Sequence, residues 1–156
     1  MGLELASERR DRAMMDLALE DARLALEWGD VPIGAVVARG GDVLGRAGNA
    51  RERDNDPTAH AEILAIRAAA ASLRSWRLTG CTIYVTLEPC AMCAGALVLA
   101  RLDRLVFGAI DPKAGFAGSL GDLTRDPRLN HRLEVESGVL ESDAARLLRQ
   151  FFEARR

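Results

Sequence analysis

Residues 82–100 read Thr-Ile-Tyr-Val-Thr-Leu-Glu-Pro-Cys-Ala-Met-Cys-Ala-Gly-Ala-Leu-Val-Leu-Ala, and the pattern changes in the middle of this segment. Its first part, 82–87, is rich in β-branched and aromatic residues, which predicts a strand. Pro89 suits the first turn of a helix, so the rest of the segment predicts a helix. Cys90 and Cys93 fall in the first turn of this helix, immediately after the strand.

Strand and helix patterns alternate on both sides of this segment. Before it, two short β-patterned runs are joined by a glycine turn, and an alanine-rich helix follows, with Asp56 or Thr58 available as its cap. The alternation implies an α/β domain in three layers, α/β/α, and the length fits a single domain over residues 1–156. The predicted elements are helices over 9–28, 58–73, 89–100 and 142–154, strands over 33–38, 43–46, 82–87, 104–108 and 133–136, and a loop over 49–57.

The composition is that of a soluble globular protein, with 49% hydrophobic and 28% charged residues. No apolar stretch approaches the roughly 20 residues that span a bilayer, and the N-terminus lacks a secretory signal, so we expect a cytoplasmic protein without a membrane span. The formal net charge of −2 does not favour nucleic-acid binding, which would need a local basic patch. Arg149, Arg155 and Arg156 could supply one, or they could belong to a solvated helix end.

The residues that indicate chemistry are His60, Glu62, Cys90 and Cys93, all at predicted helix starts. Zinc prefers nitrogen and thiolate ligands, and a catalytic site uses three protein ligands and leaves the fourth position to water. His60, Cys90 and Cys93 are three such ligands. Because two thiolates cancel the charge of the ion, water is less acidified and a nearby base is needed. Glu62 can move the protons, so the pattern predicts hydrolytic zinc chemistry.

Other interpretations of these residues fit less well. A closed structural zinc site needs a fourth ligand, and the candidates are Cys81, in or beside a strand, and His131, in a polar loop. A redox Cys-x-x-Cys pair leaves the histidine and glutamate unexplained. Three cysteines do not make a disulfide framework, and Cys81 is expected to be an inert buried thiol. Glu62 alone would more often be a first-turn residue that complements the helix dipole.

The His-x-Glu and Pro-Cys-x-x-Cys signature resembles that of the zinc-dependent cytidine and adenosine deaminases. The similarity covers the chain from about Arg12 to its end and is greatest to the bacterial tRNA-specific adenosine deaminases. This resemblance implies a cytidine-deaminase-like fold, with a central five-stranded mixed sheet between layers of helices. The segments that carry it are 30–36, 56–62, 84–96, 106–109, 111–119 and 129–132, together with Asn49.

The resemblance also implies a reaction and a set of contacts. The reaction is conversion of adenosine to inosine at the wobble position of an arginine tRNA anticodon, by a homodimer with one zinc per subunit. Asn49 would hydrogen-bond the target base, while Asp111, Lys113, Asn130 and Phe152 would line the path of the flanking nucleotides. The alternatives are a turn asparagine, a solvated Asp111–Lys113 ion pair, a loop-capping Asn130 and core packing of Phe152.

Two other functions share parts of this pattern. A deaminase of a free base or nucleotide, of the guanine or cytosine type, would carry the same signature, although residues 111–132 and the Phe151-Phe152 pair favour the tRNA enzyme. A non-catalytic RNA-binding subunit with a structural zinc belongs to another class. The presence of Glu62 and the lack of a clear fourth ligand argue against it.

Overall fold

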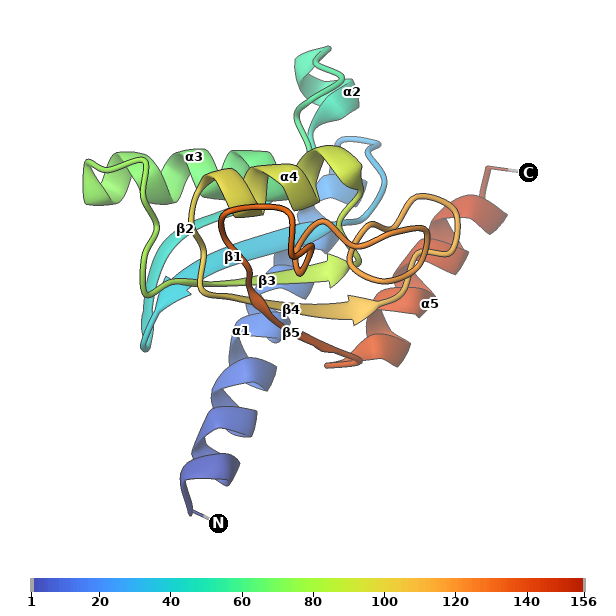
Figure 1. Cartoon of the computed structure of the whole chain (residues 1–156). Coiled ribbons are helices and arrows are strands. Elements are labelled where there is room, and N and C mark those ends of the chain that lie inside the picture. Colours follow the sequence, from blue (N-terminus) through green and yellow to red (C-terminus); the bar gives the residue numbers. More distant parts are fainter. Residues whose placement is uncertain (1, 156) are drawn as a thin grey trace.

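Five strands form one mixed sheet in the order β2-β1-β3-β4-β5 (Figure 1). This is a computed structural model, and it describes residues 2–155. β1 pairs antiparallel with both β2 and β3, whereas β3, β4 and β5 are parallel, so the predicted five-stranded mixed sheet is confirmed. The strands are β1 (Gly34–Arg39), β2 (Asp42–Gly48), β3 (Thr82–Leu87), β4 (Arg104–Ala109) and β5 (Glu134–Ser137).

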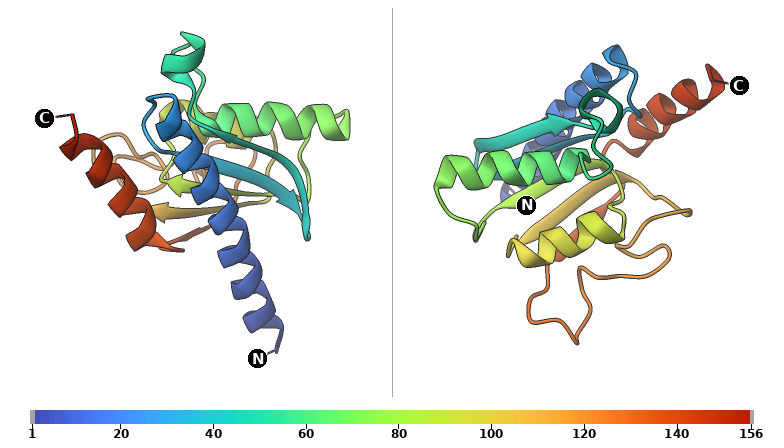
Figure 2. Two further views of the ribbon diagram at one scale, coloured as in Figure 1. Left: turned by 180° about the vertical axis from the view of Figure 1, so that it is seen from behind. Right: turned by 90° about the horizontal axis from the view of Figure 1, so that it is seen from above.

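Helices cover both faces of the sheet (Figure 2). α3 and α4 lie side by side over one face, and α1 and α5 lie on the other, which gives the predicted α/β/α layers. A further short helix, α2, precedes α3. The helices are α1 (Gly2–Glu27), α2 (Arg51–Asp54), α3 (Ala61–Leu73), α4 (Ala91–Leu99) and α5 (Glu141–Glu153).

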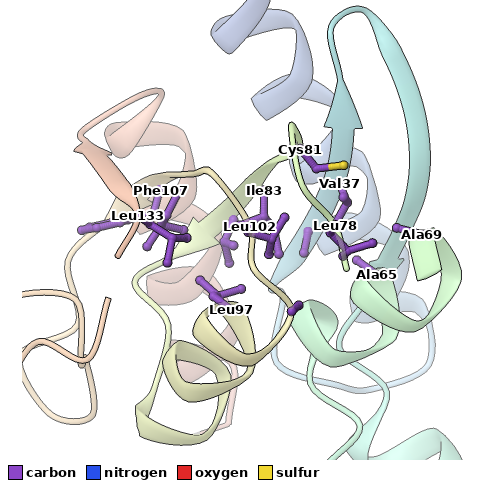
Figure 3. Close-up of a cluster of buried hydrophobic side chains, with 14 of the residues drawn as sticks. Val37, Ala65, Ala69, Leu78, Cys81, Ile83, Leu97, Leu102, Phe107 and Leu133 are labelled. Carbon is purple, nitrogen blue, oxygen red and sulfur yellow. The ribbon is translucent and has the colours of Figure 1, made fainter. Parts of the chain in front are cut away.

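Each central strand buries both of its faces, as strands between two helical layers do. Successive side chains point to opposite sides, so alternate residues enter different parts of the core. Figure 3 shows the larger part, where Leu97 of α4 and Ala65 of α3 lie against Val37 and Ile83 of the sheet. The part beneath α1 contains Met14, Met15, Ala18, Val36, Ala38, Tyr84 and Val106.

Two glycines allow the helices to lie close to the sheet. A Cβ on Gly34 would stand 1.8 Å from the carbonyl oxygen of Ala18 in α1. One on Gly45 would stand 2.4 Å from the carbonyl oxygen of Ala65 in α3. Both distances are far inside van der Waals contact, so any other residue would displace the helix. The residues of α1 and α3 that face these glycines are alanines, whose small side chains also let the helix backbone lie close to the sheet.

α1 is longer than its pattern predicts, since it begins at Gly2 and not near residue 9. Residues 2–10 are exposed, and Figure 1 shows this end of the helix extending beyond the sheet. A helix without a buried face carries no apolar periodicity, which explains the missed start. Within residues 2–155, no helix combines the length and apolarity needed to cross a membrane.

The predicted loop over 49–57 is wrong in part, because it contains α2. The carboxylate of Asp30 accepts hydrogen bonds from the backbone N–H groups of Glu52, at 2.7 Å, and Arg53, at 3.2 Å. These are orphan donors of the first helical turn, and a residue distant in sequence satisfies them. The other element boundaries differ only slightly from the prediction, apart from the start of α3 described below.

Candidate active site

Two helix N-termini meet at one end of the sheet and bring the predicted metal ligands together. α3 begins at Ala61 with His60 as its N-cap, and α4 begins at Ala91 with Cys90 as its N-cap. The prediction that His60 and Cys90 lie inside the first turns of these helices is therefore wrong by one residue. Neither side chain makes a capping hydrogen bond, and both point instead toward Cys93.

The predicted cap of α3 is also wrong, since neither Asp56 nor Thr58 caps this helix. The Asp56 carboxylate accepts hydrogen bonds from the backbone N–H of Thr58 at 2.8 Å and from its hydroxyl at 2.7 Å. The backbone N–H of Ala50 donates to the carbonyl of Ala59 at 3.0 Å. These bonds fix the turn before α3 and so set the position of His60.

The three ligand atoms form a compact triangle. The His60 Nδ1 lies 3.6 Å from the Cys90 Sγ and 3.5 Å from the Cys93 Sγ. A zinc ion held tetrahedrally at about 2.3 Å from sulfur and about 2.0 Å from nitrogen separates such ligands by about 3.5 Å. All three atoms lie within 4.8 Å of one another, so the donor set and its spacing fit zinc.

Neither proposed fourth ligand lies in this triangle. Cys81 is buried in the hydrophobic core, where burial raises the pKa of its thiol. The His131 Nε2 lies 2.6 Å from the carbonyl oxygen of Leu102. Among residues 2–155, the metal-ligand group comprises three side chains, which is the ligand number of a catalytic zinc site.

The electrostatics of the triangle favour a cation. A hydrogen bond from Cys93, with a further contribution from His60, lowers the pKa of Cys90 to about 3 although burial opposes this. The same shared proton, together with burial, raises the pKa of Cys93. The N-terminus of α4 adds the positive end of its dipole at the two sulfurs. A metal ion would replace the shared proton and hold both cysteines as thiolates.

Glu62 lies in the first turn of α3 and is only 4% exposed. Burial raises the pKa of its carboxyl group above the ordinary value. A first-turn glutamate that only complemented the helix dipole would be solvated, and this one is not. A buried carboxyl group with a raised pKa is suited to accept a proton and to return it.

The triangle opens into a cavity of about 460 Å³. His60, Glu62 and Cys90 form part of its wall, and four of the five predicted substrate contacts line it as well: Asn49, Asp111, Lys113 and Phe152. Asn130 does not line this cavity and is exposed. Apolar side chains complete the wall, among them Val31, Ile33, Leu87, Ile110 and Leu148.

Asn49 makes the turn contact of its alternative, with the backbone N–H two residues on, whereas Phe152 departs from the core packing considered for it. Asn49 is 3% exposed; its Nδ2 donates to the carbonyl of Val31 at 3.3 Å, and its Oδ1 accepts from the N–H of Arg51 at 3.3 Å. One amide hydrogen and one oxygen lone pair therefore remain for a ligand. Phe152 is 51% exposed, so its ring stands at the cavity edge and is not core packing.

The segment after β4 brings Asp111 and Lys113 to the cavity. Asp111 Oδ1 accepts the backbone N–H groups of Lys113 at 3.0 Å and of Ala114 at 3.2 Å, so this carboxylate shapes the turn. No spacing in the sequence marks Glu88 as a site residue, but it is 3% exposed and also lines the cavity. Burial alone would raise the pKa of Glu88, but hydrogen bonds from Ser119 and from backbone N–H groups lower it below its ordinary value.

The C-terminal arginines only partly form the predicted basic patch. The Arg155 Nη2 donates to the carbonyl of Gly29 at 2.9 Å, and its guanidinium lies 4.1 Å from the ring centroid of Phe151. Arg155 thus ties α5 to the end of α1. Arg149 is exposed, and Arg156 lies outside the described residues.

Several known proteins that share the fold and the sequence pattern are deaminases. Residues 9–156 match the family of MafB19-like deaminases. The chain is 50% identical over 143 residues to the tRNA-specific adenosine deaminase of Bacillus subtilis (strain 168), a match that covers 92% of this chain and 89% of that one. The chain belongs to the deaminase family. It is therefore an enzyme, and the sequence resemblance is confirmed.

Two solved structures of deaminases have the same fold as this chain. One, from a study of A-to-I editing by tRNA:A34 deaminases at the wobble position of transfer RNA, superposes with a TM-score of 0.84 and 48% identity. It covers 87% of this chain and 99% of that one. A guanine deaminase from Nitrosomonas europaea has a TM-score of 0.78 and 25% sequence identity. This match covers 90% of this chain and 83% of the guanine deaminase chain.

Proposed function

We propose that this deaminase converts adenosine to inosine at the wobble position of a tRNA anticodon, with an arginine tRNA as its substrate. The observation that carries the proposal is the buried carboxyl of Glu62 beside the His60, Cys90 and Cys93 triangle, in the wall of one cavity. The 50% sequence identity to a tRNA-specific adenosine deaminase supports the choice of substrate.

His60, Cys90 and Cys93 would hold one zinc ion per subunit. When bound, zinc supplies a Lewis acid that makes water a stronger acid and a better nucleophile. Glu62 accepts a proton from the attacking water and passes it to the ring nitrogen next to C6 of adenine. Glu62 then takes the remaining proton from the hydroxyl group added at C6 and delivers it to the departing amino group, so water and adenosine give inosine and ammonia.

The cavity is suited to a base that has left its stack. Loop nucleotides are unstacked at lower cost than paired ones, and an anticodon loop offers such nucleotides. The free donor and acceptor of Asn49 would bond the edge of the target base, and the exposed ring of Phe152 would contact a neighbouring base. Asp111 and Lys113 at the cavity wall, and Asn130 farther out, would contact the flanking nucleotides.

The proposal includes a homodimer that works in the cytoplasm, where tRNA is found. The outer surface of α4 supports the dimer because it is apolar and open. Leu99 is 70% exposed and Met92 is 38% exposed, and a Cβ added to Gly95 would meet nothing within 4 Å. Light scattering tests this part. We expect the wild-type protein to have the mass of two chains and Leu99→Arg to have the mass of one. A mass of one chain for the wild type as well as for Leu99→Arg would contradict the dimer.

A deaminase of free bases is the second candidate, because the guanine deaminase described above shares this fold. One assay separates the candidates. The zinc-loaded protein is incubated with an arginine anticodon stem-loop that carries adenosine at the wobble position, with stem-loops of other tRNAs, and with free adenosine, guanine and cytosine. Inosine from the arginine stem-loop alone supports the proposal. Ammonia only from small molecules supports the second candidate, and binding without turnover supports a non-catalytic subunit.

A further inference from the structure

The segment that follows β4 has little regular structure, although it brings Asp111 and Lys113 to the cavity. Its backbone forms turns and two isolated bridges, one of them between Gly115 and Cys90. Residues without a strand or helix partner need other groups to fix their position. Much of that fixation comes from one side chain, that of Glu88.

Glu88 follows β3, and its carboxylate is surrounded by donors from this segment. Oε1 accepts the backbone N–H of Asp111 at 3.0 Å and the hydroxyl of Ser119 at 2.5 Å. Oε2 accepts the backbone N–H groups of Ala117 at 3.0 Å and of Ser119 at 3.1 Å. Each oxygen therefore has two donors, and the segment closes around a buried anion.

The packing confirms how closely the segment encloses the carboxylate. A Cβ on Gly115 would lie 2.3 Å from the Glu88 carboxyl carbon, so a side chain is excluded there. The next residue, Phe116, donates its N–H to the carbonyl of Pro89 at 2.8 Å. Glu88 and Pro89 therefore hold this segment, and the next residue along the chain is the metal ligand Cys90.

We propose that Glu88 is a positioning residue for the substrate: it holds Asp111 and Lys113 at a fixed place beside the metal triangle, and through them it governs binding of the nucleotides that flank the target base. This inference rests on the proposed function, since it requires that Asp111 and Lys113 meet RNA. Glu88 itself contributes no proton to the reaction.

A glutamine at this position keeps the size of the side chain but replaces one acceptor by a donor. In one orientation its NH₂ group faces the N–H groups of Ala117 and Ser119, and in the other it faces the N–H of Asp111. A backbone N–H cannot turn away as a hydroxyl can. Glu88→Gln therefore loosens the segment without opening a cavity.

The first experiment compares Glu88→Gln with Tyr84→Phe on the wobble-adenosine stem-loop. We expect Glu88→Gln to raise KM about tenfold and to lower kcat by a smaller factor, because charge-assisted hydrogen bonds are lost at the binding segment only. Tyr84→Phe removes one buried hydrogen bond on the opposite face of the sheet and should leave KM unchanged. A loss confined to kcat in Glu88→Gln, or an equal rise of KM in Tyr84→Phe, would overturn the inference.

The second experiment asks whether Glu88 acts through its segment. The Asp111→Ala/Lys113→Ala double variant should raise KM, and adding Glu88→Gln to it should raise KM by less than twofold, because coupled residues are not additive. If the double variant raises KM and Glu88→Gln still adds its full tenfold effect, the positioning role is wrong and the RNA contacts stand. If the double variant leaves KM unchanged, the RNA contacts and the positioning role both fail.

Amide hydrogen exchange gives a readout that is independent of turnover. The N–H groups of Asp111, Ala117 and Ser119 should exchange at least tenfold faster in Glu88→Gln than in wild type, while amides of β1 remain protected. Unchanged protection at all three amides would overturn the inference.

Discussion

The carboxylate of Asp11 in α1 accepts two hydrogen bonds from the guanidinium of Arg104 in β4, at 2.8 and 2.7 Å. The hydroxyl of Tyr84 in β3 donates to the same carboxylate at 3.1 Å, and Glu136 of β5 also pairs with Arg104. The side chain of Asp11 is 6% exposed and that of Arg104 is 22% exposed. This network joins the buried part of α1 to three strands.

Replacing Arg104 should destabilise the fold strongly. Arg104→Met leaves the Asp11 carboxylate buried without its cation, and breaking a buried pair in this way costs about 3 kcal/mol. Urea denaturation measures the free energy of unfolding. The control is Arg146→Met, since Arg146 pairs with Asp143 at 3.5 Å on an exposed surface, where such pairs contribute less than about 1 kcal/mol. Equal losses in the two variants would contradict a buried network.

The same network predicts a loss of stability at high pH. Burial, followed by the neighbouring Asp11 carboxylate, raises the pKa of Tyr84 to about 12 from an ordinary value of 10.0. Between these two values the unfolded chain loses the phenolic proton while the folded chain keeps it. The stabilisation is therefore complete below pH 10 and is lost as the pH rises to 12, by about 2 kcal/mol.

Tyr84 is the only tyrosine of the chain, so its ionisation can be followed directly by ultraviolet absorbance. We expect the folded protein to titrate near pH 12 and the urea-unfolded protein near pH 10. Tyr84→Phe should lack the corresponding part of the fall in stability. A folded-state titration at the ordinary pH would show that Tyr84 is not held by this network.

The sequence predicted best those features that depend on neighbouring residues. The strand before Cys90 and the helix after it follow from local propensity, and the ligand set follows from two short signatures, His-x-Glu and Cys-x-x-Cys, although these lie about thirty positions apart. The features that it missed depend on distant partners. Asp30 accepts the first-turn N–H groups of α2, Glu88 anchors the segment after β4, and Asp11 meets Arg104 across ninety-three positions. No local pattern marks such pairings.

The positions of the metal ligands show the same limit more finely. The sequence placed His60 and Cys90 inside helices, because the polar and proline residues before them resemble ordinary helix starts. In the structure both residues are N-caps whose side chains point away from the cap toward each other. The spacing identified the residues, but the exact helix starts depend on how α3 and α4 pack over the sheet.

The ligand set predicts that cysteine replacements will differ sharply in their effect on zinc. Cys90→Ala removes one of three ligands and should reduce the zinc content of the purified protein to well below one ion per chain. Cys81→Ala is the matched control, because Cys81 is a buried thiol in the core and lies outside the metal triangle. Zinc content can be measured by atomic emission after dialysis. Full zinc in Cys90→Ala, or its loss in Cys81→Ala, would refute the assignment.

Glu62 provides the most direct test of the chemistry. Glu62→Ala leaves all three ligands in place, so the protein should keep its zinc and its fold, while inosine formation from the stem-loop should fall about a thousandfold or more because proton transfer is lost. Glu141→Ala is the matched control: Glu141 also lies in the first turn of a helix, but it is exposed and outside the cavity. This variant should retain full activity. If Glu62→Ala binds zinc and still turns over at a rate close to that of Glu141→Ala, then Glu62 does not carry the protons, and the raised pKa that burial gives it serves no catalytic purpose.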